Sequence, residues 1–148
     1  MKTELLHTIG RVERVDLPSW QIEGIEAKID TGAYSSSVHC HHIEEIEKNG
    51  ESHVQFYLFD PEHEGYNERL IVLPIFDKRE VKSSNGQSSF RIFIKTHIML
   101  FGSSFEIELS LADRSEMKFP LLIGRKFLKG RFLVDVSRKN LSLKNRTM

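Results

Sequence analysis

The sequence lacks the features that would link the chain to a disulfide, a membrane or a nucleic acid. Among 148 residues there is one cysteine, Cys40, which excludes an internal disulfide and suits a reducing compartment. No apolar run approaches the roughly 20 residues that span a bilayer. Residues 1–18 contain charges among their apolar positions and have no signal-peptide core. Lysine plus arginine and aspartate plus glutamate both number 21, so the net charge is zero. We therefore expect a cytoplasmic protein with no membrane or nucleic-acid partner, and a single domain over residues 1–148.

Helical periodicity is also scarce, and apolar residues mostly recur with a period of two. Residues 105–113, FEIELSLAD, and residues 89–95, SFRIFIK, alternate in this way, which is typical of strands. Further apolar runs of strand length cover residues 53–59, 69–76 and 131–136. Short strands together with ten phenylalanines favour an all-β barrel or sandwich.

Turn residues separate these runs, and two segments have weak helical signals. Asn49-Gly50 and Asn85-Gly86 are pairs that tight hairpins prefer, and residues 101–103 form another turn signal. Residues 40–50 have room for one helical turn, and residues 123–130, IGRKFLKG, predict a short helix that ends at Gly130.

Asp30-Thr31-Gly32 follows the end of a predicted strand and has the composition of a catalytic loop. Asp30 would emerge where the chain turns, Thr31 supplies a hydroxyl, and Gly32 permits backbone conformations that other residues resist. An aspartate held in this way can share a proton with a second carboxylate and activate a bound water. The same residues also suit an ordinary Asx turn, so the tripeptide alone leaves both interpretations open.

The segments around and after this tripeptide resemble those of the retropepsins. DTGA at residues 30–33, followed by a serine-rich strand, is similar to their active-site loop. PLLIGRKFL at residues 120–128 is similar to the segment that passes behind that loop, and the polar hairpin over residues 79–93 lies where a flap is expected. Over about residues 10–137 the match is closer to the bacterial retropepsin-like proteins labelled "putative ATP-dependent zinc proteases".

This resemblance implies a closed β-barrel of the retropepsin-like acid protease type, with one short C-terminal helix, and aspartic peptidase activity without a cofactor. Because D-T-G occurs once, the resemblance implies a homodimer in which each chain contributes Asp30. Asp113 and Asp135 are the alternative partners within one chain, but neither is followed by Thr/Ser-Gly. Some bacterial members act with ligases that add glutamate tails, which implies glutamate-rich peptides or protein tails as substrates. Neither H-E-x-x-H nor a phosphate-binding loop supports the zinc or ATP in the label.

Basic and polar residues in these motifs are the candidates for substrate binding. Guanidinium groups bind carboxylates through paired hydrogen bonds, although charges at alternate strand positions also make an ordinary solvated face. In viral enzymes an acidic residue that pairs with the late arginine stands where this chain has Tyr34. Arg125 therefore needs another partner or binds substrate carboxylates. The predicted set is Ala33, Arg79, Lys82, Ser83, Ser84, Asn85, Gly86, Arg91, Arg114 and Arg125.

The run His39, Cys40, His41 and His42 has the chemistry of zinc ligands but not their expected geometry. If the strand continues through it, only two of the four side chains share a face, whereas zinc needs about four converging ligands. His53, His63 and His97 are further donors, but their spacing predicts no site. We therefore predict no metal here. The alternatives that remain are a non-catalytic peptide-binding module and a zinc-dependent hydrolase built on this run.

Overall fold

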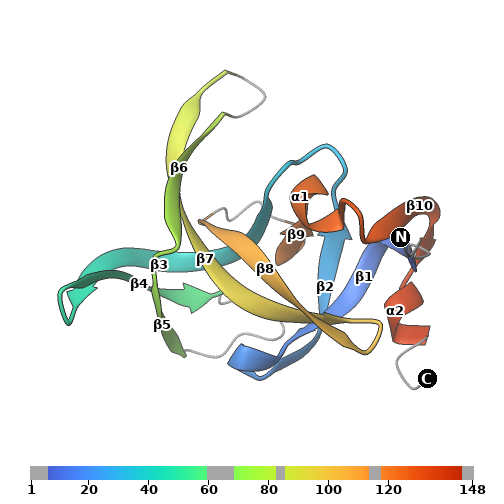
Figure 1. The fold of residues 1–148 in the computed structure, drawn as a ribbon, viewed down its shortest axis with the longest axis horizontal. Coiled ribbons are helices and arrows are strands. Elements are labelled where there is room, and N and C mark those ends of the chain that lie inside the picture. Colours follow the sequence, from blue (N-terminus) through green and yellow to red (C-terminus); the bar gives the residue numbers. More distant parts are fainter. Residues whose placement is uncertain (1–6, 60–68, 83–85, 114–117, 145–148) are drawn as a thin grey trace, which may run out of the picture.

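The structure, a computed structural model, describes residues 7–59, 69–82, 86–113 and 118–144 and consists mainly of β strands (Figure 1). The strands are β1 (His7–Leu17), β2 (Ile22–Ile29), β3 (Ser36–Lys48), β4 (Glu51–Leu58), β5 (Leu70–Pro74), β6 (Asp77–Lys82), β7 (Ser88–Leu100), β8 (Ser103–Ala112), β9 (Leu121–Ile123) and β10 (Phe132–Lys139). Three short helical segments join them: the 3-10 helix η1 (Pro18–Trp20), α1 (Arg125–Leu128) and α2 (Leu141–Lys144). In these ranges no helix has the length and apolarity to cross a bilayer.

Six of the strands close into a mixed β-barrel. They are hydrogen-bonded in the order β1-β2-β9-β3-β8-β7, and β7 returns to β1 through the pair Asp16 and Met99. Strand β10 adds in parallel to the outer edge of β1, and β6 continues the sheet beyond β7. The expected all-β closed barrel is therefore confirmed, and α1 lies where the short helix was predicted.

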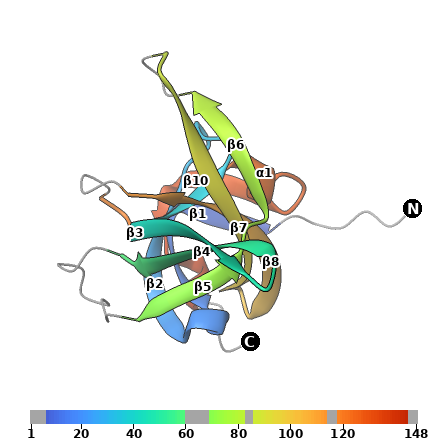
Figure 2. The ribbon, with the colours of Figure 1, turned by 90° about the vertical axis from the view of Figure 1, so that its left-hand side faces the viewer.

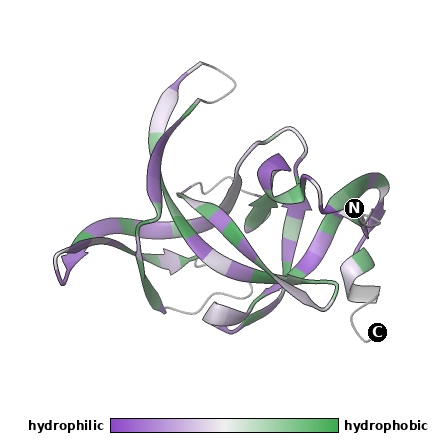
Figure 3. Cartoon of the chain, viewed as in Figure 1, coloured by the Kyte–Doolittle hydropathy of each residue, from purple (hydrophilic) through white to green (hydrophobic). Residues whose placement is uncertain are grey.

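The alternating residues of the strands fill the barrel interior. Ile107, Leu109 and Leu111 of β8 are buried, whereas Glu106 and Glu108 on the opposite face are not. The expected alternation ends at Leu109, because Ser110 and Ala112 are buried as well. Figure 3 shows the resulting alternation of apolar and polar residues along the strands. Each buried aliphatic side chain contributes about 1.5–3 kcal/mol through removal of its surface from water.

Strand β3 leaves the barrel and forms a smaller sheet with β4 and β5 (Figure 2). The predicted helical turn within residues 40–50 is wrong, because β3 continues to Lys48 and its backbone pairs with β4. A register shift after His41, with a left-handed His42, changes the alternation along the strand. Asn49 and Gly50 then form the hairpin turn with φ values of 54° and 79°, as their sequence predicted.

A buried glutamate attaches the C-terminal segment to the barrel. Glu13 of β1 is fully buried, and its carboxylate accepts hydrogen bonds from the backbone N–H groups of Gly10 (2.7 Å), Leu141 (3.2 Å) and Ser142 (2.9 Å). The last two residues begin α2, so this carboxylate satisfies amides that the short helix leaves without partners. Because three donors surround the carboxylate, its burial is compatible with a stable fold.

We expect Glu13→Gln to lower the free energy of unfolding by about 2 kcal/mol, because the new amide NH₂ would face backbone donors. Urea unfolding measures this change, with Glu26→Gln as a control that alters an exposed carboxylate on β2. Equal unfolding midpoints for the two variants would contradict the assigned role of Glu13.

Candidate active site

The loop that contains Asp30 begins where β2 ends and is held from behind by β9. Ile29 of β2 pairs with Ile123 of β9, and the N–H of Asp30 donates to the carbonyl of Ile123 at 2.8 Å. On its other edge β9 pairs with β3, Ser37 lying opposite Leu122. Strand β9 therefore lies between the strand that precedes the loop and the strand that follows it.

The Asp30 carboxylate is oriented by the backbone of its own loop. Its Oδ1 accepts a hydrogen bond from the N–H of Gly32 at 3.0 Å, and the N–H of Ala33 donates to the Asp30 carbonyl at 3.2 Å. Asp30 is partly buried, whereas Thr31 and Gly32 are exposed. The tripeptide therefore forms an Asx turn, and this turn fixes the orientation of the Asp30 carboxylate.

Gly124 brings the backbone after β9 against the loop. A Cβ at this position would lie 2.5 Å from the carbonyl oxygen of Ser35 and 2.8 Å from that of Ala33. The N–H of Gly124 donates to the buried Ser36 Oγ at 3.0 Å. Only glycine permits this close approach of the two backbones.

Arg125 braces the loop from the first position of α1. Its N–H donates to the Ala33 carbonyl at 2.8 Å, its Nη1 donates to the Thr31 carbonyl at 2.9 Å, and its guanidinium lies 5.9 Å from the centre of the Tyr34 ring. The carbonyl groups and the aromatic ring are therefore the partners that replace the acidic residue of the viral enzymes.

The predicted flap is the hairpin of β6 and β7, which extends well away from the barrel in Figure 1. Arg79 and Arg91 are directly opposite each other in its register, so their side chains share one face. Gly86 is exposed and left-handed, with a φ of 85°. Ser83, Ser84, Asn85 and Arg114 lie outside the described residues. Lys82 ends β6, but its side chain is not described.

A pocket of about 190 Å³ opens between the end of the Asp30 loop, the base of this hairpin and α1. Its polar lining consists of Ser35, Ser36, Arg79, Glu106, Glu108, Lys126 and Arg131. Arg79 was predicted from the sequence, whereas Glu108, Lys126 and Arg131 were not. In the sequence, Glu108 is only a polar position in an alternating strand, and no neighbouring residue predicts that α1 lies opposite it.

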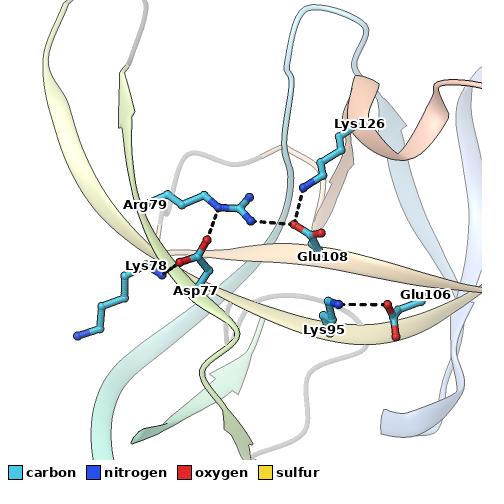
Figure 4. A network of polar contacts seen from close by, with 7 residues as sticks. All are labelled: Asp77, Lys78, Arg79, Lys95, Glu106, Glu108 and Lys126. Atoms are coloured by element: carbon cyan, nitrogen blue, oxygen red, sulfur yellow. Dashed lines mark hydrogen bonds and ion pairs between the residues drawn. The ribbon is translucent and has the colours of Figure 1, made fainter.

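Charged side chains form a network at the pocket (Figure 4). Arg79 donates through Nε to Asp77 at 2.6 Å and through Nη2 to Glu108 Oε1 at 3.2 Å, and Lys126 donates to the same oxygen at 2.9 Å. Burial alone raises the pKa of Glu108, but the hydrogen bond from Lys126 and the two positive charges hold it below its ordinary value. The hydrogen bond from Arg79 likewise lowers the pKa of Asp77. Both carboxylates are therefore charged at neutral pH.

Asp113 and Asp135 are the alternative partners for Asp30 within one chain, and each lies in a different environment from the Asp30 loop. Asp135 Oδ1 accepts hydrogen bonds from the N–H and Oγ of Ser137 at 2.9 and 2.6 Å, which lower the pKa of this carboxyl. Asp113 is exposed just after the end of β8. In the described part of the chain no hydrogen bond joins either carboxylate to Asp30.

The His39–His42 run lies on β3 and its polar groups face the backbone. Nδ1 of buried His39 lies 3.2 Å from the Ala112 carbonyl, and Nδ1 of His41 lies 2.7 Å from that of Phe59. Burial raises the pKa of the Cys40 thiol to about 12, whereas zinc binds the thiolate. No group of three or more His, Cys, Asp or Glu side chains in the described ranges could hold a metal, and His63 lies outside them. The geometry therefore gives the zinc hydrolase alternative no support.

Comparison with known proteins shows one family over most of the chain. The model of the RimB-like family, "Retropepsin-like aspartic endopeptidase RimB", matches residues 8–145. Proteins named "Probable alpha-L-glutamate ligase" are similar: that of Shewanella pealeana is 37% identical over 133 residues, 87% of this chain and 28% of the relative. That of Desulfotalea psychrophila is 34% identical over 131 residues, 86% of this chain and 27% of the relative. The chain thus spans little more than a quarter of these relatives.

A solved structure shares the fold. Lpg0085 of Legionella pneumophila, described as a protein with unknown function (DUF785), superimposes with a TM-score of 0.75 and 26% identity. The match covers 92% of this chain and 98% of that protein.

We expect Gly124→Ala to destabilise the protein by about 1–3 kcal/mol, because its methyl group would overlap the carbonyl groups of Ala33 and Ser35. The measurement is thermal unfolding followed by circular dichroism, with Lys129→Ala as an exposed control in the same segment. A melting temperature like that of the control would show that the loop tolerates a side chain here.

Cys40 should resist alkylation while the protein is folded. With a pKa of about 12, the thiolate is about one ten-thousandth of the thiol at pH 8, and burial further blocks access. Mass spectrometry after iodoacetamide treatment should show an unmodified native protein and complete modification in urea. Native alkylation at the rate of a free cysteine would contradict the buried position.

Proposed function

Because the chain belongs to the RimB-like family of retropepsin-like aspartic endopeptidases, we propose that it hydrolyses peptide bonds with two Asp30 carboxylates, one from each of two copies. The observation that carries this proposal is the mounting of Asp30 at the end of a barrel strand, with its backbone bound to β9 and one carboxylate oxygen bound to Gly32. Such an arrangement presents a carboxylate in a fixed orientation, as acid–base catalysis requires.

A second copy supplies the carboxylate that one chain lacks. D-T-G occurs once, and Asp135 is already engaged by Ser137. In a symmetric dimer the same loop meets itself across a two-fold axis, so a single motif provides both members of the pair. Two carboxylates this close share one proton, because both cannot ionise at low cost.

The proposed reaction uses this shared proton in both steps. The ionised carboxylate removes a proton from a bound water while the protonated carboxyl donates to the carbonyl oxygen of the peptide. The water oxygen adds to the carbonyl carbon and forms a tetrahedral intermediate. As the C–N bond breaks, the leaving amine takes the proton that the first carboxylate removed from water, and a hydroxyl of the intermediate returns its proton to the second carboxylate, which restores the pair. Thr31 and Gly32 belong to the loop that holds Asp30, and the β6–β7 hairpin covers the substrate.

We propose acidic, glutamate-rich peptides or protein tails as substrates. Two features support this class: the curated relatives are named alpha-L-glutamate ligases, and Arg79 and Arg91 share the same face of the hairpin. Guanidinium groups recognise carboxylates by bidentate hydrogen bonds, so an acidic peptide would be favoured over an apolar one.

The decisive variant is Asp30→Asn, which we expect to reduce kcat by at least about 10³-fold, since an amide cannot take up the proton of water. Its Oδ1 can still accept the Gly32 N–H, so the loop should keep its structure. Mass spectrometry of poly-α-glutamate and neutral peptides after incubation identifies the products. Asp135→Asn is the matched control and should keep full activity. Equal cleavage by Asp30→Asn and wild type would exclude an aspartate-pair mechanism, and binding without cleavage by either would favour a peptide-binding module.

The shared site can be tested by mixing subunits. An excess of Asp30→Asn protein should suppress wild-type activity, because mixed dimers contain one competent aspartate, and sedimentation velocity should show a dimer at the assay concentration. An active species that sediments as a monomer would refute the two-copy site.

A further inference from the structure

The pocket beside the catalytic loop is bounded by three parts of the active-site region. Ser35 and Ser36 follow the loop, Arg79 belongs to the hairpin, and Lys126 belongs to α1. Ser36 also accepts the hydrogen bond of Gly124, which connects the pocket wall to the backbone that supports the loop. A group bound in this pocket therefore lies next to the chain segment that carries Asp30.

The pocket combines an apolar floor with charged side chains: the cations Arg79, Lys126 and Arg131, together with Glu108 and with Glu106, which pairs with Lys95. Phe93, Ile107 and Phe127 are buried and line it. The guanidinium of Arg79 lies 4.6 Å from the centre of the Phe93 ring, and that of Arg131 lies 4.8 Å from the centre of the Phe127 ring. Apolar surface beneath cations suits an aliphatic stem that ends in a carboxylate, which is the shape of a glutamate side chain.

Glu108 already occupies the position where such a carboxylate would bind. One of its oxygens, Oε1, accepts from both Arg79 and Lys126, at 3.2 and 2.9 Å. A guanidinium has five N–H donors, and Asp77 and Glu108 each accept from one of them among the described contacts, so further donors are available to a ligand. The Glu108 side chain is 23% exposed, so solvent and ligands can reach it.

We propose that this pocket is a subsite for an acidic side chain of the substrate, and that Glu108 is an internal competitor which a substrate carboxylate displaces from Arg79 and Lys126. The inference rests on the proposed function, since it concerns a peptide bound at the same site. Glu108 neutralises the two cations in the unbound protein, and it thereby sets how strongly an acidic peptide must bind to replace it.

The sign of this effect separates a competitor from an ordinary binding residue. Removal of the Glu108 charge leaves the two cations for the ligand, so affinity for an acidic peptide should rise. Removal of the Lys126 charge should lower it. A purely structural network predicts the opposite for Glu108, because loss of its carboxylate would disorder the cations and weaken binding.

Binding is measured in the Asp30→Asn background, where peptides are not turned over, by fluorescence anisotropy of labelled hexa-α-glutamate and hexaglutamine at low ionic strength. We expect Glu108→Gln to bind hexa-α-glutamate about five-fold more tightly and Lys126→Gln to bind it about five-fold more weakly, the size of a partly exposed ion pair. Hexaglutamine affinity should stay within two-fold in both variants.

Glu45→Gln is the matched control. It removes a carboxylate that is paired with Lys78, the neighbour of Arg79 on β6, and changes the net charge by the same amount. Its affinity for hexa-α-glutamate should remain within two-fold of the Asp30→Asn parent. An equal gain in Glu45→Gln would show that only net charge matters and would overturn the subsite.

Two outcomes in Glu108→Gln would also overturn it: unchanged or weaker hexa-α-glutamate binding by a folded variant, or an equal gain for hexaglutamine. If thermal unfolding shows that Glu108→Gln does not fold, Lys126→Gln and Arg79→Gln decide, and binding at the parent affinity by both overturns the subsite. Because the assay needs no cleavage, tighter binding together with a wild type that cleaves nothing would reject the peptidase and support the subsite.

Discussion

The candidate site depends on the passage of one short strand, β9, between β2 and β3. Three parallel pairs and two antiparallel pairs fix β9 in register with the strands on either side of the Asp30 loop. This register places Gly124 against the loop carbonyls, where no side chain fits. The next two residues follow directly from this contact: Arg125 reaches the Thr31 carbonyl, and Lys126 lines the pocket.

The same contact explains how a small exposed loop is kept in one conformation. Its backbone carbonyls at Thr31, Ala33 and Tyr34 each accept a hydrogen bond from Arg125 or Lys126, so the loop is fixed by main-chain groups more than by packing. The polar groups of the loop backbone therefore satisfy one another without the second carboxylate oxygen of Asp30. The conformation of the loop and the placement of Asp30 rest on the same bonds.

Much of the fold was predictable from the sequence, because strand periodicity and hairpin turns are local properties. The alternation of residues 105–113, the Asn49-Gly50 turn and the helix after Gly124 were all predicted, and the resemblance to the retropepsins is confirmed by the family match. The continuation of β3 to Lys48 was missed because its pairing partner β4 determines it. The role of Glu13 was missed for the same reason, since its donors at Leu141 and Ser142 are 128 and 129 residues away.

The charge network shows the same limit at the site itself. Arg79 was identified from its place in the hairpin, but its neighbours Glu108 and Lys126 come from β8 and α1, and no spacing rule relates them. Arg79 and Lys126 are partly exposed, and both donate to Glu108, which is the anion that the two cations share in the unbound protein. Under the proposed exchange, the residue that holds the pocket together without substrate is also the one that sets its selectivity. Stronger bonds from Glu108 to Arg79 and Lys126 would therefore make the base of the hairpin more rigid but would lower its affinity for acidic peptides.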